Sequence, residues 1–345
     1  KPIMGSRNAE GYGKAMSFAQ DRLRINQARY PISAGDTMTQ QRTPHQLRSL
    51  ARTLGEAYMN RLQDQLSLVH MAGARGFHNN VEWAVPLASD PDFASILVNP
   101  VRAPSRNRHF MSTGTGLETV KAAASEITMT TADVFNADLV DSLRAQLDSM
   151  ALAPSPIEFD GDKLAADSPL RVLLVSSDQF ASFAQSTNYR TYLSNAIARG
   201  QQAGNHPLFM GGDTALWNGI LMVKMPKPIR FYAGNPINWC ASTTSETETT
   251  TDLAPAALGT GYAIDRAILL GGQALAEAWG KHRKTGNPFF WSEKELDHDD
   301  KLELLVGAIN GRSKVRFEVD HGNEKQITDN GIIAIDTVVK LGVAA

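Results

Sequence analysis

Between residues 43 and 73, apolar side chains recur every three or four positions, and this spacing constrains the fold more than any other feature. The recurring residues are Leu47, Leu50, Leu54, Tyr58, Leu62, Leu66 and Val69. The period predicts one amphipathic helix, with Thr43, Pro44 and Gln46 as its start signal and Gly73 as its stop. A helix of about thirty residues is a rod of about 45 Å, whereas a typical globular helix has about 11–12 residues.

The face of this helix opposite the apolar stripe is charged, with Arg48, Arg52, Arg61 and Asp64. It is either a solvated face or a spine that neighbouring subunits cross. We expect the six stripe residues from Leu47 to Leu66 to anchor the helix by packing. Replacement of Leu54 by Asp is therefore predicted to abolish folding or assembly.

An extended segment precedes the helix at residues 22–34. Apolar and polar residues partly alternate there, which predicts a strand ending at Gly35. A lone strand cannot bury its own apolar face, and no neighbouring segment obviously supplies a partner.

Residues 77–130, after the helix, are irregular and proline-rich. So long a stretch without regular structure is unusual in a compact domain unless it is functional or lies against a partner. It contains a small basic cluster formed by Arg102, Arg106, Arg108 and His109.

The rest of the chain mixes helices and strands without regular alternation. Helices are predicted at 135–150, after the strand at 170–175 with a cap near Ser177 or Asp178, at 189–199, and at 263–279 with Gly271 and Gly272 inside it. Strands are predicted at 170–175, 219–225, 314–319 and 331–339. This pattern indicates an α+β fold, and 345 residues suggest about two domains.

The charge of the chain is unevenly distributed. Residues 1–76 contain eleven Lys and Arg against five Asp and Glu, although the net charge of the whole chain is −2. A basic segment on an acidic remainder is consistent with nucleic-acid binding, or with attraction between copies of the chain. The single cysteine, Cys240, excludes an intrachain disulfide, and no apolar run reaches the roughly 18 residues of a membrane span.

The sequence contains almost none of the common catalytic, cofactor-binding or metal-binding motifs. The sequence has no phosphate-binding loop, dinucleotide loop, nucleophile elbow or zinc-protease motif. The densest titratable run, residues 293–300, is read as a solvated acidic turn before a strand rather than a cation site. We therefore predict no catalytic residues, no cofactor and no metal.

Several runs resemble a known family. The sequence MTQQRTPHQLRSLARTLGEAYMNRLQDQLSLVHMAGARG at 38–76 resembles the start of the spine helix of tailed-phage major capsid proteins, in the family of N-four-type podophages and related myophages with the Hong Kong 97-type fold. KPIMG and residues 22–35 resemble that family's extended loop, and 206–226, 265–280, 289–317 and 329–339 resemble later segments, with a helix at 265–280. These runs cover roughly two-thirds of the chain, and their order and number carry the resemblance.

The resemblance implies three structural parts. We expect the returning half of an extended loop at 1–38, a peripheral domain with the spine helix at 39–130 and 296–345, and an axial domain at 131–295. The family begins with an N-terminal arm and an outgoing loop strand, and both are missing from this sequence. We therefore expect the chain to be part of a longer one.

The function implied is that of a major capsid protein, which is not an enzyme. It would assemble as pentamers and hexamers into the icosahedral head of a tailed phage in the host cytoplasm and enclose double-stranded DNA without sequence specificity. Further partners would be the portal and scaffold or decoration proteins, and no membrane. The contacts between subunits are predicted at Arg24, Arg29, Tyr30, Arg102 and Arg106, with Arg24 and Arg29 in salt bridges.

Two alternatives stay open. An encapsulin-like nanocompartment has the same fold but encloses an enzyme cargo instead of a genome. A soluble α+β enzyme with a dispersed site would form a small closed oligomer with a ligand pocket.

Overall fold

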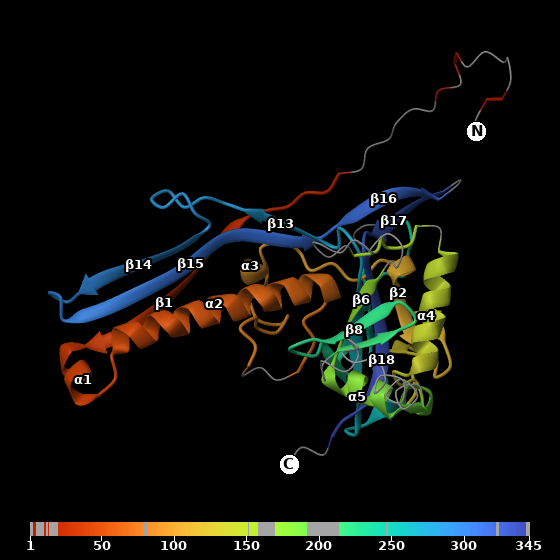
Figure 1. The fold of residues 1–345 in the computed structure, drawn as a ribbon, viewed down its shortest axis with the longest axis horizontal. Helices are drawn as coiled ribbons and strands as arrows, with labels where there is room; N and C mark the ends of the chain where they lie inside the picture. Colours follow the sequence, from red (N-terminus) through yellow and green to blue (C-terminus); the bar gives the residue numbers. More distant parts are fainter. Residues whose placement is uncertain are drawn as a thin grey trace, which may run out of the picture.

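The computed structural model describes residues 3–4, 10–11, 13, 20–78, 82–150, 152–157, 170–191, 214–245, 248–321 and 324–342. They form a rounded body and a long arm that projects from one side of it (Figure 1). The fold is therefore mixed α+β, as predicted.

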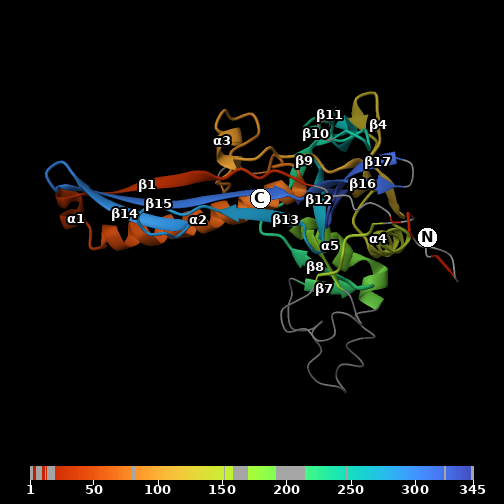
Figure 2. The same ribbon diagram turned by 90° about the horizontal axis from the view of Figure 1, so that it is seen from above.

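The arm consists of one helix laid along one sheet. The helix is α2 (Leu47–Ala72), and the central strand of the sheet is β15 (Lys301–Lys314). β1 (Asn26–Asp36) pairs with one edge of β15, while β14 (Phe289–Leu296) and β13 (Leu275–Trp279) pair with the other. Figure 2 shows these strands side by side along α2, with the short helix α1 (Thr37–Arg42) at the tip.

The predicted long helix is confirmed, although its start signal is not. Gly73 ends α2 in the left-handed conformation, with φ 67°, and donates its N–H to the Val69 carbonyl at 3.0 Å. The N-cap is Gln46, which makes no side-chain capping bond, so the expected cap at Thr43 is wrong. The reason is that Thr43 follows directly on α1, and Gln40 from that helix accepts the Leu47 N–H at 3.0 Å instead.

α2 approaches the sheet of the arm closely. A Cβ on Gly55 would lie 2.8 Å from Val306 Cγ2 and 2.9 Å from Ile32 Cδ1. Farther along the same side of the sheet, the rings of Tyr30 and Tyr58 stack with centroids 4.0 Å apart. The absence of a side chain at residue 55 thus allows helix and sheet to meet here.

The body is built on an eight-stranded sheet. Its order is β3 (Leu117–Thr119), β2 (His109–Ser112), β18 (Ile332–Lys340), β12 (Tyr262–Leu270), β6 (Arg171–Val175), β8 (Ile220–Lys224) and β7 (Thr214–Trp217), with β9 (Arg230–Tyr232) also paired to β12. Alternate residues of β12 and β18 enter two separate cores. One core packs against α4 (Ala137–Ser149) and α5 (Ser177–Gln185), and the other against the C-terminal half of α2.

Smaller elements complete the body. They are α3 (Phe93–Leu97), the 3-10 turns Arg106–Arg108 and Ala256–Leu258, the sheet of β10 (Pro236–Trp239), β11 (Thr250–Leu253), β5 (Glu126–Ile127) and β4 (Ala122–Ala123), and the hairpin of β16 (Arg316–His321) and β17 (Glu324–Asp329).

The helix predicted at 263–279 is wrong. This run forms β12 and β13, with a turn at Gly271 and Gly272 between them. Its Ala and Leu residues favour a helix, but β12 is buried on both faces and pairs along nine residues with β18, so long-range packing decides the structure. A Cβ on Gly271 would lie 2.5 Å from the Ser155 carbonyl oxygen, which explains the glycine.

The strand predicted at 22–34 is present, but its expected environment is wrong. It is β1, and it pairs with β15 of the same chain from Asn26↔Asn310 to Asp36↔Lys301. The partner of this strand is therefore a distant strand of the same chain. A sequence search near residue 30 could not find a partner that lies about 275 residues away.

Other predicted elements are confirmed, with small shifts. α4, β6, β8, β16 and β18 lie in the predicted regions. α5 is capped by Ser176, one residue before the predicted cap, through a bond of 3.2 Å from the Gln179 N–H to Ser176 Oγ. Most of the helix predicted at 189–199 lies outside the described residues.

Candidate assembly surfaces

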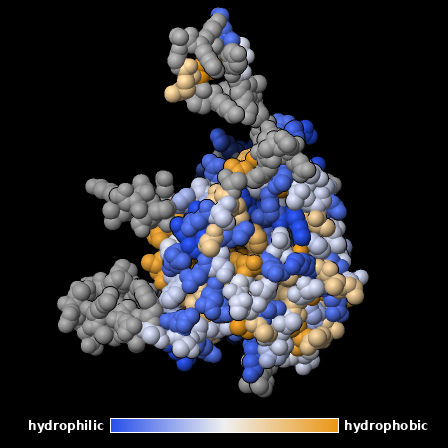
Figure 3. All heavy atoms as spheres, turned by 90° about the vertical axis from the view of Figure 1, so that its right-hand side faces the viewer, coloured by the Kyte–Doolittle hydropathy of each residue, from blue (hydrophilic) through white to orange (hydrophobic). Residues whose placement is uncertain are grey.

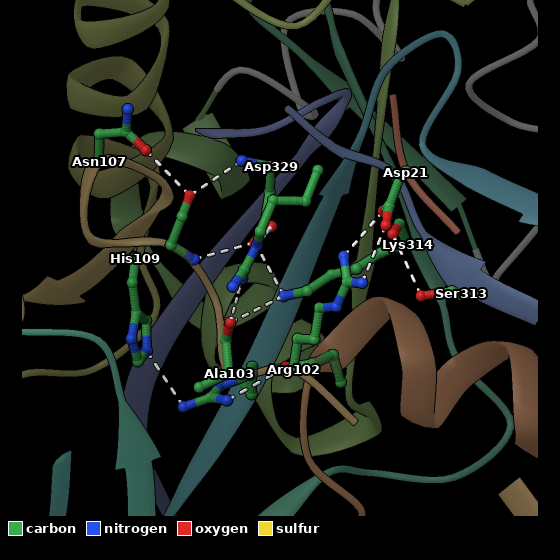
Figure 4. A network of polar contacts seen from close by, with 12 residues as sticks. Asp21, Arg102, Ala103, Asn107, His109, Ser313, Lys314 and Asp329 are labelled. Carbon is green, nitrogen blue, oxygen red and sulfur yellow. Dashed lines mark hydrogen bonds and ion pairs between the residues drawn. The ribbon is translucent and has the colours of Figure 1, made fainter. Parts of the chain in front are cut away.

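A buried charge cluster joins the arm to the body (Figure 4). Asp329 accepts hydrogen bonds from Lys314 Nζ at 2.8 Å and Arg316 Nε at 2.6 Å, and all three side chains are almost fully buried. Lys314 also donates to the Ala103 carbonyl at 3.1 Å, and the Ser105 N–H donates to Asp329 at 2.9 Å. The cluster thus connects the C-terminal end of β15 to residues 103–105 and to β17.

Burial sets the ionisation of this cluster. It lowers the pKa of Lys314 to about 8, against the opposing attraction of Asp329. Burial alone would raise the pKa of Asp329, but Lys314 and Arg316 outweigh it and hold that pKa below its ordinary value. The energetic cost of removing these charges from water offsets much of their mutual attraction, so the pair adds little net stability, whereas loss of one partner would leave an uncompensated buried charge.

A second buried cluster holds the end of α2. Arg266 donates to Asp336 at 2.7 and 2.9 Å and to the carbonyl of Ala72, the last residue of α2, at 3.1 Å. Nε2 of His109 lies 2.7 Å from Asp336 and 3.0 Å from Nη2 of Arg266, and burial lowers the pKa of His109. A cation on a free helix carbonyl is stabilising, and here it attaches the helix to the central sheet.

Residues 21–24, which precede β1, bind to residues 99–102 beside the first cluster. Arg102 forms a two-pronged salt bridge with Asp21 at 2.8 and 2.9 Å. The side chain of Asn99 accepts the Arg24 N–H and donates to the Arg24 carbonyl, both at 2.9 Å. A Cβ on Gly311 would collide with that carbonyl, so the glycine allows the segment to cross β15.

One side of the arm carries a cavity of about 340 Å³ between β1, α2 and the end of α3, called here the β1 groove. Its apolar lining includes Ala28, Tyr30, Tyr58, Met59, Leu62, Leu66, Ile96 and Leu97. Nearer the tip, outside the lining of this cavity, Leu50 is 46% and Leu54 65% exposed on α2.

The other side of the arm carries exposed aromatic residues from β13 and β14. Trp279 is 42%, Phe289 51% and Trp291 49% exposed, and we call these three residues the aromatic edge. The rings of Trp279 and Phe289 are 5.0 Å apart, and the Arg52 guanidinium lies 4.7 Å from the centre of the Trp291 ring. Large exposed apolar side chains grouped in this way are typical of interaction surfaces.

The six predicted stripe residues of the helix divide into three groups. Leu62 and Leu66 are buried, Leu47 and Tyr58 are partly buried, and Leu50 and Leu54 are exposed. Leu50 and Leu54 therefore do not anchor α2 within its own chain, because Ala51 and Gly55 face the sheet in their place. A periodic stripe cannot distinguish a residue that faces its own core from one that faces a neighbour.

The five predicted contact residues also differ from one another. Arg102 binds Asp21, Arg106 donates to the Val120 carbonyl, and Tyr30 stacks on Tyr58, so these three have partners in their own chain. Arg24 and Arg29 are exposed, and their side chains form no salt bridge with any residue that the structure describes. Salt bridges from Arg24 and Arg29 to another subunit stay predictions.

The aromatic edge was missed by the sequence analysis. The predicted helix at 263–279 contains Trp279, and Trp291 lies twelve residues farther along the chain. Pairing of both β13 and β14 with β15 brings them together. The alternation of Phe289 and Trp291 along one strand was the available signal.

On the face of the body away from the arm, hydrophilic and hydrophobic residues are interspersed (Figure 3). Within the described ranges, no three His, Cys, Asp or Glu residues are grouped so that they could hold a metal ion. No helix in that part of the chain is long and apolar enough to span a membrane.

Comparisons with known proteins agree on one family and one fold. A family model described as "Phage capsid protein" matches residues 1–341. The capsid of Ralstonia phage GP4 is 24% identical with a TM-score of 0.70, over 100% of this chain and 82% of that chain. No curated protein matches the chain.

Two more distant capsid structures share the fold. One is the capsid asymmetric unit of cyanophage Pam1, 14% identical with a TM-score of 0.61. The other is the acidic stable capsid of Helicobacter pylori bacteriophage KHP30, 11% identical with a TM-score of 0.59. Each match covers 99% of this chain and 82% of the other.

Proposed function

Because this chain belongs to the phage capsid protein family, we propose that its copies assemble as pentamers and hexamers into the icosahedral head of a tailed phage. The head encloses double-stranded DNA. The single observation that carries this proposal is the family match over almost the whole chain. The arm adds a physical reason, because its two sides expose apolar residues that a solitary subunit leaves in water.

Assembly follows from repeated contacts between different surfaces. A contact that joins two different faces of the same chain generates a ring when the rotation closes. Each subunit in a shell has several neighbours, so contacts that are individually weak combine into a stable particle. The function therefore requires surfaces and a rigid shape, and we propose that the chain has no catalytic role.

We propose the N-four-type family and the Hong Kong 97-type parts on the sequence resemblance. The extended loop comprises 1–38, and its strand β1 pairs with β15 of the arm. The peripheral domain comprises 39–130 and 296–345, with α2 and β15 of the arm, and the axial domain comprises 131–295. The eight-stranded sheet contains strands from both domains, so the boundary between them passes through one sheet.

Further partners are proposed on the same basis. They are the portal, scaffold or decoration proteins, and packaged DNA held without sequence specificity. Assembly takes place in the host cytoplasm, and the mature protein resides in the virion.

The test is the mass of the particles from the native source, measured by light scattering or mass photometry with electron microscopy of the same sample. Closed icosahedral particles of many megadaltons that contain DNA are expected. Closed particles that contain a protein cargo would favour the encapsulin-like nanocompartment. A discrete species below about half a megadalton at all salt concentrations would contradict a shell, because shells form by multivalent association, and would favour the soluble enzyme.

A further inference from the structure

The β1 groove and the aromatic edge lie on opposite sides of one rigid arm. β1 pairs with one edge of β15, whereas β13 and β14 pair with the other. The contacts of α2 show the same separation, since Tyr58 stacks on Tyr30 of β1 while the Arg52 guanidinium lies over the ring of Trp291 in β14. One copy of the chain therefore presents a hollow on one side and protruding rings on the other.

The two sides are complementary in shape and polarity. The cavity of the β1 groove, about 340 Å³, has the size of a site that buries large side chains. The aromatic edge supplies three large rings, each between 42% and 51% exposed. Aromatic anchors that enter pockets are the usual centre of a protein interface.

The two sides are also complementary in charge. Arg24, Arg29 and Arg61 lie along β1 and the groove side of α2, and none forms a salt bridge within the described part of the chain. Residues 289–300, which contain β14 and its turn, have five acidic residues and one lysine. Two of these acids are paired, Glu293 with Arg48 and Asp297 with Lys301, which leaves Glu295, Asp299 and Asp300 without a salt bridge among the described residues.

We infer that the β1 groove of one subunit receives the aromatic edge of a second copy of this chain. The inference rests on the proposed shell function and adds the two surfaces that meet. Trp291 and Phe289 pack over Leu54 and enter the groove beside Tyr58, and the arginines of the groove side face the acidic turn. Because the contact joins different faces, it continues from copy to copy around a ring.

Side chains rather than added strands make this contact. Among the strands that the structure describes, none pairs with the outer edge of β1, and a free edge can pair with another chain. Pro31 lies in the middle of β1, however, and it has no N–H to donate. A proline on an edge strand opposes strand addition, which leaves the apolar groove as the binding surface.

The test places a photo-crosslinking benzoylphenylalanine at position 54 and, in a second variant, at position 291. Particles are assembled from equal amounts of ¹⁵N-labelled and unlabelled chains, irradiated, digested and analysed by mass spectrometry. Crosslinked peptides with mixed labels come from two subunits. The control variant has the probe at Thr53, which is exposed on α2 next to Leu54.

From position 54 we expect mixed-label crosslinks to residues 275–296, and from position 291 to residues 26–30 or 50–66. The Thr53 variant should give at least tenfold fewer crosslinks to 275–296. Crosslinks from position 54 to other segments of a second copy, to the same copy alone, or to no peptide within intact particles would overturn the inference. Failure of the unmodified chain to form particles would instead overturn the proposed function.

If the probe at position 54 prevents assembly, the variant at position 291 tests the contact alone. Particles should still form from that variant, since the probe replaces one aromatic ring by another. Crosslinks from position 54 to position 54 of another copy would show a symmetric contact and would also overturn the inference.

Discussion

Replacement of Gly55 by Ala tests how closely the long helix lies on the sheet of the arm. The new Cβ would lie 2.8 Å from Val306 Cγ2 and 2.9 Å from Ile32 Cδ1, whereas carbon atoms prefer separations of about 3.5–4.0 Å. The end of Ile32 can rotate away, but Val306 is β-branched and stiff. Overpacking of this kind costs about 1–3 kcal/mol.

Two effects therefore oppose each other at this position. Ala is favoured over Gly within a helix by about 1 kcal/mol, so the net destabilisation of the arm is about 0–2 kcal/mol. Replacement of Val306 by Ala removes Cγ2 and the clash. In that background Gly55→Ala should stabilise the arm by about 1 kcal/mol, since only the helix preference remains.

The assay is hydrogen exchange of the α2 amides in unassembled subunits, which reports the free energy of opening the arm. The four members of the cycle are the wild type, the two single variants and the double variant. Asn60→Ala, an exposed change on the same helix, serves as control and should show no coupling to Val306→Ala. Stabilisation by Gly55→Ala of about 1 kcal/mol in both backgrounds would refute the close approach, because the preference for Ala alone gives that value.

Three further predictions concern assembly and pH. Leu54→Asp should leave the secondary structure of the subunit intact, because Leu54 is 65% exposed. The same change should abolish particles. Each contact between subunits would lose about 1–2 kcal/mol from apolar burial, and the contact would bury a carboxylate. Circular dichroism and electron microscopy check this, and intact particles would contradict it. Reversal of Arg24 and Arg29 to Glu should reduce shell yield without changing the melting temperature of the subunit, and an unchanged yield would contradict their placement between subunits. Burial lowers the pKa of His70 to about 4. As the pH falls below 6.5, His70 therefore takes up a proton in the unfolded chain but not in the folded one. The free energy of unfolding should then fall by up to about 1.4 kcal/mol per pH unit toward pH 4. Urea unfolding of subunits should show a shallower decline for His70→Gln, and an equal decline would show that His70 is accessible to solvent.

Local signals in the sequence predicted the elements that local forces determine. The period of α2 and the stop at Gly73 were readable because both depend on residues within one helix. The helix predicted at 263–279 failed for the opposite reason. β12 owes its conformation to β18, β6 and β9, which lie far away in the sequence.

The candidate surfaces were only partly predictable. The spacing identified Leu50 and Leu54 as apolar positions. Their exposure could not be predicted, because it depends on the packing of the Gly55 face of α2 against the sheet. The aromatic edge depends on two strands that meet the same central strand. The buried clusters around Asp329 and Asp336 were not predictable at all, because their members come from three and four separate segments, respectively.

The buried charges at the base of the arm matter because of leverage. α2 has 26 residues, so the tip of the arm lies about 39 Å from the base. A tilt of about 5° at the base would displace the tip by about 3 Å over that length, roughly the length of one hydrogen bond. The directional bonds of Arg266 and Lys314 restrict that tilt where a small error in angle would be magnified most. The accuracy with which distant contacts align is therefore set at the fixed end of the arm.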